Sequence, residues 1–296
     1  MSGSSRTLST STVIASRGQK AYFIRRLLSE TLVARRVVTI PGGALSSKLV
    51  WVRSFIKKTV RHINRAQYYP RLTEPSDLVV LALASKALVV GSAVCNLVEA
   101  DFYEEAFGLT RTLVEIYLNL RYITNEGNSD RAETYANFFA KDHEGWTNLI
   151  QRYYPANPLN LPSHHAEMMK IAKRYKHPHS WSGLPGQVKA MAVEEDKFEN
   201  DPSGKPLKCE FDYEVIYKWT SHYVHATVVA IDTHAVEART PFAIHSRKRF
   251  GIRLKELALF NTVVYLTKIL LRSFSAIGRQ VPRSISEEAD RLLKSF

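Results

Sequence analysis

Apolar residues recur every three or four positions along most of the chain, and strict alternation of apolar and polar residues is hard to find. A step of three to four is the pattern of an amphipathic helix, whereas alternation would indicate a β-strand. One such stripe consists of Leu109, Leu113, Ile116, Leu120 and Ile123. The pattern therefore predicts an all-α protein.

Capping residues and breaks give the expected bounds of the helices. Ser76 is a good N-cap for the first apolar helix, and Ser284 with Glu287 has the spacing of a capping box. The expected helices cover residues 48–69, 77–98, 101–124, 129–153, 163–176, 188–194, 212–237 and 252–277, with a short C-terminal helix from Ser284. Four long and several short helices predict a helical bundle with up-and-down packing.

Residues 177–210 interrupt this pattern, because the periodicity fades and Pro and Gly gather there. Irregular segments of this length in compact domains are either functional lids or disordered. We therefore expect a long irregular insertion within the helical domain, with one short helix near residues 188–194.

Charge is distributed unevenly along the 296 residues, whose formal net charge is +13. Residues 1–72 hold 14 Lys and Arg against the single acid Glu30, whereas residues 73–296 hold equal numbers of basic and acidic residues. The sequence predicts a basic, partly helical N-terminal arm, residues 1–72, on a neutral helical domain, residues 73–296. We expect the arm to bind nucleic acid or another polyanion, and its deletion to abolish this binding while the domain stays folded.

Targeting and redox signals favour a cytoplasmic protein. No apolar core of a secretory signal follows the charged start, although an Arg- and Ser-rich N-terminus is also typical of organellar transit peptides. Cys95 and Cys209 lie far apart, which predicts two free thiols in a reducing compartment. Lys86 and Lys268 interrupt the two most apolar stretches, so we expect no membrane span. The sequence gives no oligomeric state.

Polar residues are dense on the helix expected over 212–237, yet they match no hydrolase pattern well. Ser221, His225 and Asp232 share a face, but seven residues of helix rise by about 10 Å, so Asp232 cannot orient His225. His222 and His225, with Glu115 from another helix, are the best metal-ligand set, although no Glu-x-x-His motif accompanies them. A metal-dependent hydrolase stays an alternative, and neither a resident metal nor a cofactor is expected, since the phosphate-binding glycine loops are missing as well.

Two stretches of the sequence resemble helices of a known protein family. The first is a small-residue helix with Arg111 and Glu115 four residues apart, and the second is an aromatic helix in which Ser221 precedes His225 by four. Together they resemble a widespread family of uncharacterised, mostly bacterial, all-helical proteins, over roughly residues 75–275. The arrangement is similar to small helical domains of toxin and phage-defence systems, some of which cleave RNA. The resemblance implies that Arg111, Glu115, Ser221 and His225 belong together.

Two interpretations of these four residues stay open. In a ribonuclease-like site, His225 would be the general acid and base, and Arg111, oriented by Glu115, would stabilise the charge of a phosphoryl group. In a non-enzymatic protein-interaction module, the four side chains would form a hydrogen-bonded network sealed in the helical core. The interpretations differ in whether the cluster is reachable from solvent.

Overall fold

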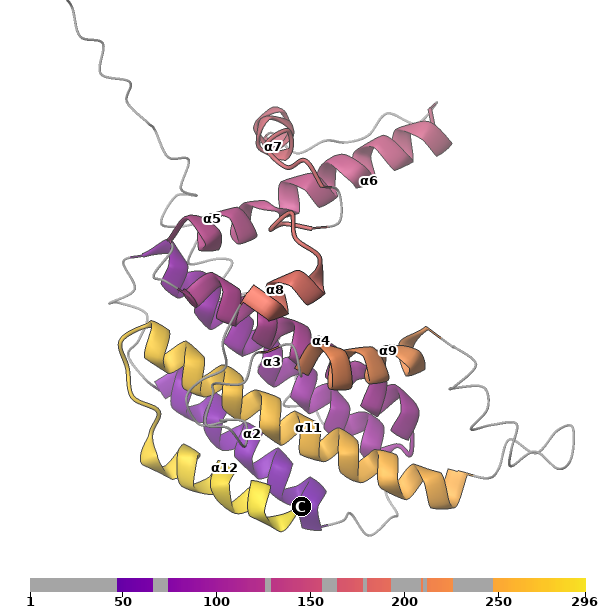
Figure 1. Ribbon diagram of the computed structural model, residues 1–296, viewed down its shortest axis with the longest axis vertical. Helices are drawn as coiled ribbons and strands as arrows, with labels where there is room; N and C mark the ends of the chain where they lie inside the picture. Colours follow the sequence, from indigo (N-terminus) through magenta and orange to yellow (C-terminus); the bar gives the residue numbers. More distant parts are fainter. Residues whose placement is uncertain are drawn as a thin grey trace, which may run out of the picture. The chain divides into compact units, whose positions relative to one another are not determined.

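The computed structural model describes residues 47–65, 74–125, 129–155, 164–177, 180–192, 209, 212–225 and 247–296. Within these residues all regular elements are helices, as the sequence predicts (Figure 1). They are α2 (Ser47–Arg65), α3 (Pro75–Glu99), α4 (Tyr103–Thr124), α5 (Ser129–Asn137), α6 (Phe139–Tyr153), α7 (His165–Ala172), α8 (Gly186–Ala192), the π-helix η3 (Asp212–Tyr217), α9 (Lys218–Val224), α11 (Arg247–Ala276) and α12 (Arg283–Ser295). The expected C-terminal half of the helix over 212–237 lies outside the described residues.

The core lies where α3, α4 and α11 pack on one another. Tyr117 of α4 and Tyr265 of α11 are the largest of its fully buried side chains. Gly91 of α3 allows close packing on α11, because a Cβ at this position would lie 2.9 Å from Leu266 Cδ1. The three helices that the sequence shows as long and apolar are therefore the ones that bury the core.

Two of these core helices are long and apolar enough to cross a membrane by length and composition. The segments are Ser76–Glu99 in α3 and Leu254–Ala276 in α11, and 61% of the most apolar window of each is buried inside the protein. Central helices of globular proteins have the same composition. The expectation that the chain has no membrane span stays a prediction.

Helix α2 begins within the segment assigned to the basic arm, and it packs against α3, α12 and α11. Leu49, Val52 and Phe55 are buried in the common core. A deletion through residue 72 would therefore remove core side chains as well as charge. The part of the arm before residue 47 lies outside the described residues.

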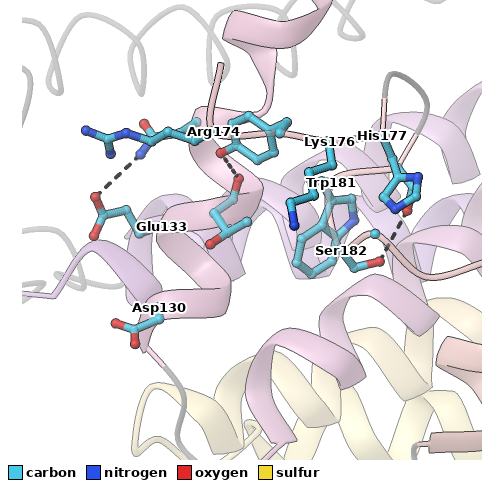
Figure 2. Close-up of a pocket in the computed structure, with 12 residues that line it drawn as sticks. Asp130, Glu133, Arg174, Lys176, His177, Trp181 and Ser182 are labelled. Atoms are coloured by element: carbon cyan, nitrogen blue, oxygen red, sulfur yellow. Dashed lines mark hydrogen bonds between the residues drawn. The ribbon is translucent and has the colours of Figure 1, made fainter. Parts of the chain in front are cut away.

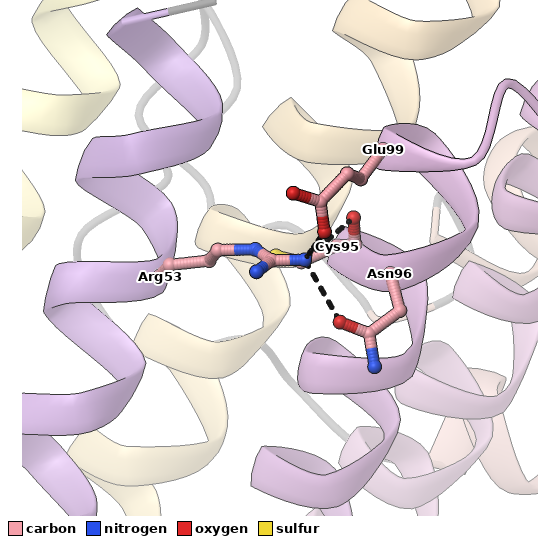
Figure 3. A network of polar contacts seen from close by, with 4 residues as sticks. All are labelled: Arg53, Cys95, Asn96 and Glu99. Atoms are coloured by element: carbon pink, nitrogen blue, oxygen red, sulfur yellow. Dashed lines mark hydrogen bonds and ion pairs between the residues drawn. The ribbon is translucent and has the colours of Figure 1, made fainter. Parts of the chain in front are cut away.

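An arginine fixes α2 to the last turn of α3 (Figure 3). Arg53 Nη2 donates to Asn96 Oδ1 at 2.8 Å and forms an ion pair with Glu99. The same nitrogen lies 3.5 Å from the carbonyl oxygen of Cys95, and a cation is favourable at this end of a helix because the last carbonyls have no partner within the helix. Arg53 thus has a structural role, because it joins two helices. Burial raises the pKa of the neighbouring Cys95 thiol to about 12.

Three local expectations were wrong. The helix expected over 129–153 is divided at Phe138, where backbone bonds to the third preceding residue tighten the turn and redirect the chain. Helix α3 begins at Pro75, so its N-cap is Glu74 in place of Ser76. The capping box of α12 does not form, because Glu287 accepts a hydrogen bond from Arg283 Nε at 2.7 Å.

Helices α6 and α7 form a hairpin with a small core of its own. Ala140 of α6 packs against Met168 and Ala172 of α7. His143 Nε2 and His165 Nδ1 also join the two helices, 3.0 Å apart. Helix α7 is the main packing partner of α6 among the described elements.

Candidate functional site

A polar stripe runs along α4 on the side that meets residues 181–189 and 217–225. Its members are spaced by three or four residues, and they are Arg111, Glu115, Asn119 and Tyr122. Each contacts or interacts electrostatically with a residue outside α4. The stripe therefore links the regular bundle to the irregular insertion.

Arg111, Tyr217 and His225 meet at one end of this stripe, and we call them the Arg111 cluster. Arg111 Nη2 donates to the Tyr217 hydroxyl at 2.6 Å, and Arg111 Nη1 lies 3.2 Å from His225 Nε2. The guanidinium carbon also lies 4.6 Å from the centroid of the Tyr217 ring. Since His225 is exposed and Arg111 half-buried, the cluster lies at the surface.

The contact between Arg111 and His225 fixes the roles of its two atoms. A guanidinium group carries hydrogen-bond donors alone, so His225 Nε2 must be the acceptor. In this arrangement the single lone pair of Nε2 is occupied by the Arg111 N–H group. The imidazole is able to act as a base toward a substrate when Arg111 donates elsewhere.

The cluster depends on close packing of η3 and α9 against their neighbours. The Tyr213 and Tyr217 rings stack with centroids 4.9 Å apart. Tyr213 lies against Gly186, where a Cβ would come within 2.9 Å of its ring. Gly108 has the same role under α9, because a Cβ there would lie 3.2 Å from Val224 Cγ2. These two glycines allow the chain to bring Tyr217 and His225 to Arg111.

Two of the four residues that the resemblance groups together form no side-chain hydrogen bond with Arg111 or His225 in the described structure. Ser221 Oγ donates to the carbonyl oxygen of Tyr217 at 2.6 Å, a bond to the preceding turn of its own helix. Glu115 is exposed and forms no ion pair with Arg111 within the described structure. Because Glu115 and His225 are both exposed, the expected network sealed in the core is not formed. Sequence spacing alone could not show this, since it does not fix which rotamer Glu115 adopts.

Glu115 instead interacts electrostatically with a second group, which we call the Trp181 cluster. Trp181 Nε1 and Lys189 Nζ both donate to Asn119 Oδ1, at 3.2 and 3.0 Å. Lys189 Nζ also lies 5.4 Å from the centre of the Trp181 ring. Burial lowers the pKa of Lys189, and the charge of Glu115 partly opposes this shift. The Trp181 cluster thus fixes α8 and residue 181 to α4.

Trp181 also forms part of the wall of a cavity of about 480 Å³ beside α5 (Figure 2). Glu133 and Asp130 line it from α5, and Arg174 and Lys176 line it from the end of the α7 segment. Sequence analysis missed this cavity. The available signal was a tryptophan in a Pro- and Gly-rich segment, because an aromatic side chain there needs a packing surface elsewhere in the fold.

The metal-ligand set proposed from the sequence is not assembled in the described part of the chain. No three His, Cys, Asp or Glu side chains among the described residues are grouped so that they could hold a metal ion. His222 and His225 lie on the same short helix end, and the interactions of Glu115 are with Lys189 and Tyr135. Asp232 lies outside the described residues.

A buried polar network does exist, made of residues that the sequence analysis did not single out. Asp212 is 3% exposed and forms an ion pair with Lys268, 3.4 Å from Nζ to Oδ2. Its carboxylate also accepts a hydrogen bond from the Tyr265 hydroxyl. This network joins η3 to α11 in the core.

Residues 77–240 match the model of DUF5677, a family of unknown function. The chain belongs to this family. The DUF5677 match confirms the resemblance, although it ends before α11, whereas the resemblance was expected to reach residue 275. It includes the whole Arg111 cluster and leaves out α2, α11 and α12. No curated protein and no solved structure matches the chain.

Proposed function

We propose that the protein associates with RNA and cleaves it at the Arg111 cluster. The observation that carries this proposal is the pairing of an exposed histidine with an arginine from a distant helix, 3.2 Å apart. Arginine donors bind phosphate oxygens, and a neutral imidazole accepts a proton. Family membership supports no specific activity, so the proposal rests on this geometry.

The guanidinium of Arg111 has unused hydrogen-bond donors. Each Nη carries two N–H groups, and the contacts with Tyr217 and His225 use one on each nitrogen. Among the described residues, the buried Nε has no hydrogen-bond partner. The two remaining Nη donors are therefore the groups that would bind a phosphodiester.

The reaction that suits these residues is transfer of the phosphodiester to the neighbouring 2′-hydroxyl. When Arg111 Nη1 turns from His225 to the phosphate, the lone pair of Nε2 is released. His225 Nε2 then takes the proton of this hydroxyl while the 2′-oxygen bonds to phosphorus and the bond to the 5′-oxygen breaks. The Tyr217 hydroxyl accepts from Arg111, so its own hydrogen is available to protonate the departing 5′-oxygen. Arg111 stabilises the charge of the pentavalent phosphorus.

Helix α2 supports binding of a polyanion by residues 1–72. Lys57 and Arg61 are exposed and one helical turn apart, and neither enters an ion pair in the described structure. Lys48 and Lys58, in contrast, pair with Glu256 and Glu288. We propose the cytoplasm as the location, which the two buried free thiols support.

The test is incubation of the purified full-length protein with an end-labelled single-stranded RNA. Wild-type protein is expected to produce fragments that end in a 2′,3′-cyclic phosphate, and His225→Asn to lose at least about a hundredfold in rate. An RNA of the same sequence with 2′-O-methyl groups lacks the nucleophile and should stay intact. The double variant Lys57→Glu with Arg61→Glu should weaken binding of the RNA, although His225 is still present.

The matched control is His164→Asn, an exposed histidine just before α7. This variant should cleave like the wild type. RNA that stays intact with the wild type, or fragments made equally well by His225→Asn, would refute the proposal. Cleavage that a chelator abolishes would instead favour the metal-dependent hydrolase.

A further inference from the structure

Helix α6 exposes four large apolar side chains on one side. Phe139, Trp146, Leu149 and Tyr153 are 51%, 66%, 47% and 68% exposed, and their spacing of seven, three and four residues places them on one side of the helix. We call these four residues the α6 stripe. Large side chains gathered in this way on a surface are typical of an interaction site.

The other side of α6 is already occupied. Ala140 and Thr147 are buried, and Ala140 packs against α7. The α6 stripe lies on the side that α7 leaves uncovered. It is therefore a surface with a large apolar area and no packing partner among the described elements.

We propose that the α6 stripe binds the same stripe of a second copy, with the two α6 helices antiparallel. A two-fold axis at Trp146 brings Phe139 of each copy opposite Tyr153 of the other, because both lie seven residues from the axis. Such a self-complementary surface is what the commonest form of homodimer requires. This inference is independent of the proposed function.

Two charges near the stripe fit this pairing. Asp142 lies in the first turn of α6, among the residues of the stripe, and Arg152 lies in the last turn, at its edge. Neither enters an ion pair within the described structure, and both are exposed. The two-fold axis places Asp142 of each copy within about a turn of the other's Arg152, so the dimer gains two ion pairs.

Gly145 lies in the middle of α6 at the edge of the stripe, on the same side as Arg152. Glycine destabilises a helix relative to alanine. A Cβ at this position would meet no atom within 4 Å, so packing among the described residues does not require glycine there. In the proposed dimer, the missing side chain leaves room for the second copy at the edge of the interface.

The area of the stripe suits a weak dimer. Its aromatic residues have side chains of about 150–250 Å² each, so the exposed part of the stripe amounts to about 400 Å² per copy. With the flanking residues, the two copies together would bury about 1,000 Å², which is the lower limit for a specific interface. We therefore expect dissociation in the micromolar range.

A lipid surface is a poorer occupant of the same stripe. Helices that lie on membranes carry Lys and Arg around the apolar face. Helix α6 has one Lys, one Arg, one Asp and one Glu, and Asp142 lies beside the apolar residues, where an acid would enter the lipid boundary. The balanced charges favour a second copy with complementary charges.

Sedimentation equilibrium of the full-length protein over about 1–100 μM tests the dimer. Trp146→Glu is expected to raise the dissociation constant at least about thirtyfold. Trp51→Glu is the matched control, since Trp51 is 48% exposed on α2 and should leave the dimer unchanged. Circular dichroism melting checks that both variants are folded.

Charge reversal tests the antiparallel register. Asp142→Arg and Arg152→Asp should each weaken the dimer, and the double variant should restore it, because the exchanged charges again face each other. Gly145→Leu should weaken the dimer while α6 stays helical.

A wild type that is monomeric at 100 μM would overturn the proposal. A dimer that Trp146→Glu or the charge reversals leave unchanged would overturn it as well. A monomer that binds vesicles of phosphatidylcholine and phosphatidylserine through Trp146 would overturn it too, and would assign the stripe to lipid.

Discussion

The π-helix η3 supplies one residue to each of two polar clusters. One cluster is buried in the core, and the other lies at the surface. Asp212, at its first position, forms an ion pair and a hydrogen bond with α11 in the core. Tyr217, at its last position, accepts a hydrogen bond from Arg111 in the surface cluster that contains the exposed His225. Two residues of one six-residue element therefore belong to a buried network and to a candidate active site.

The comparison shows that a polar cluster has to be judged by its access to solvent and by its unused donors. In the core, the Asp212 carboxylate is enclosed by protein groups that neutralise it, so it has no capacity for a ligand. In the Arg111 cluster, unused N–H groups of Arg111 and the exposed imidazole of His225 lie at the surface. The first arrangement suits stability, and the second suits binding and proton transfer.

The largest effect on stability is expected for Asp212→Ala. Removing one member of a buried ion pair leaves the other charge without its partner, which costs about 3 kcal/mol in the free energy of unfolding. Urea denaturation followed by circular dichroism measures this. The matched control is Glu214→Ala in the same element, because its ion pair with Lys218 is more exposed than that of Asp212 and should contribute less than about 1 kcal/mol. Equal costs for the two variants would mean that burial does not distinguish the clusters.

A smaller effect is expected in the Arg111 cluster. Tyr217→Phe keeps the ring that stacks on Tyr213 and removes the hydroxyl that Arg111 binds, so it should cost at most about 1.5 kcal/mol. A double-mutant cycle with Arg111→Ala should give a coupling of about 0.5–1 kcal/mol. A cost near that of Asp212→Ala would instead make the Arg111 cluster a structural one and favour the interaction module.

The helical periodicity was enough to predict the all-α class and the bounds of α3 and α4 within a few residues, because apolar residues recur along their whole length and most of them are buried. It failed at Phe138 because the turn there is made by helical dihedral angles, so neither Pro nor Gly marks it. The capping residues failed for a similar reason. Glu287 has two partners within reach, and the sequence does not say whether Arg283 or the backbone binds it.

For the site, the family resemblance implied that Arg111 and His225 belong together, and the structure brings them together. It could not place Glu115 or Ser221, since a side chain at the edge of a helix has several polar neighbours and chooses among them by its rotamer. The network around Asp212 was invisible because its partners lie more than 50 residues away on an apolar helix. Long-range pairing of this kind carries no local pattern.

The smallest effect concerns the Trp181 cluster, which is intermediate in burial between the other two. Burial lowers the pKa of Lys189 in the folded protein, whereas in the unfolded chain it stays near its ordinary value of 10.5. Below that value the unfolded chain binds more protons than the folded one, so the free energy of unfolding should rise with pH as 10.5 is approached, by at most about 1.4 kcal/mol per pH unit.

Lys189→Met should remove this rise between about pH 8 and 10, while Lys86→Met, which removes an exposed lysine, should keep it. Tyr135 acts in the opposite direction at higher pH, because burial raises its pKa and stability then falls as the unfolded chain ionises. Parallel profiles for the wild type and Lys189→Met would show that Lys189 is as well solvated as a surface lysine, and the Trp181 cluster would then belong with the surface group.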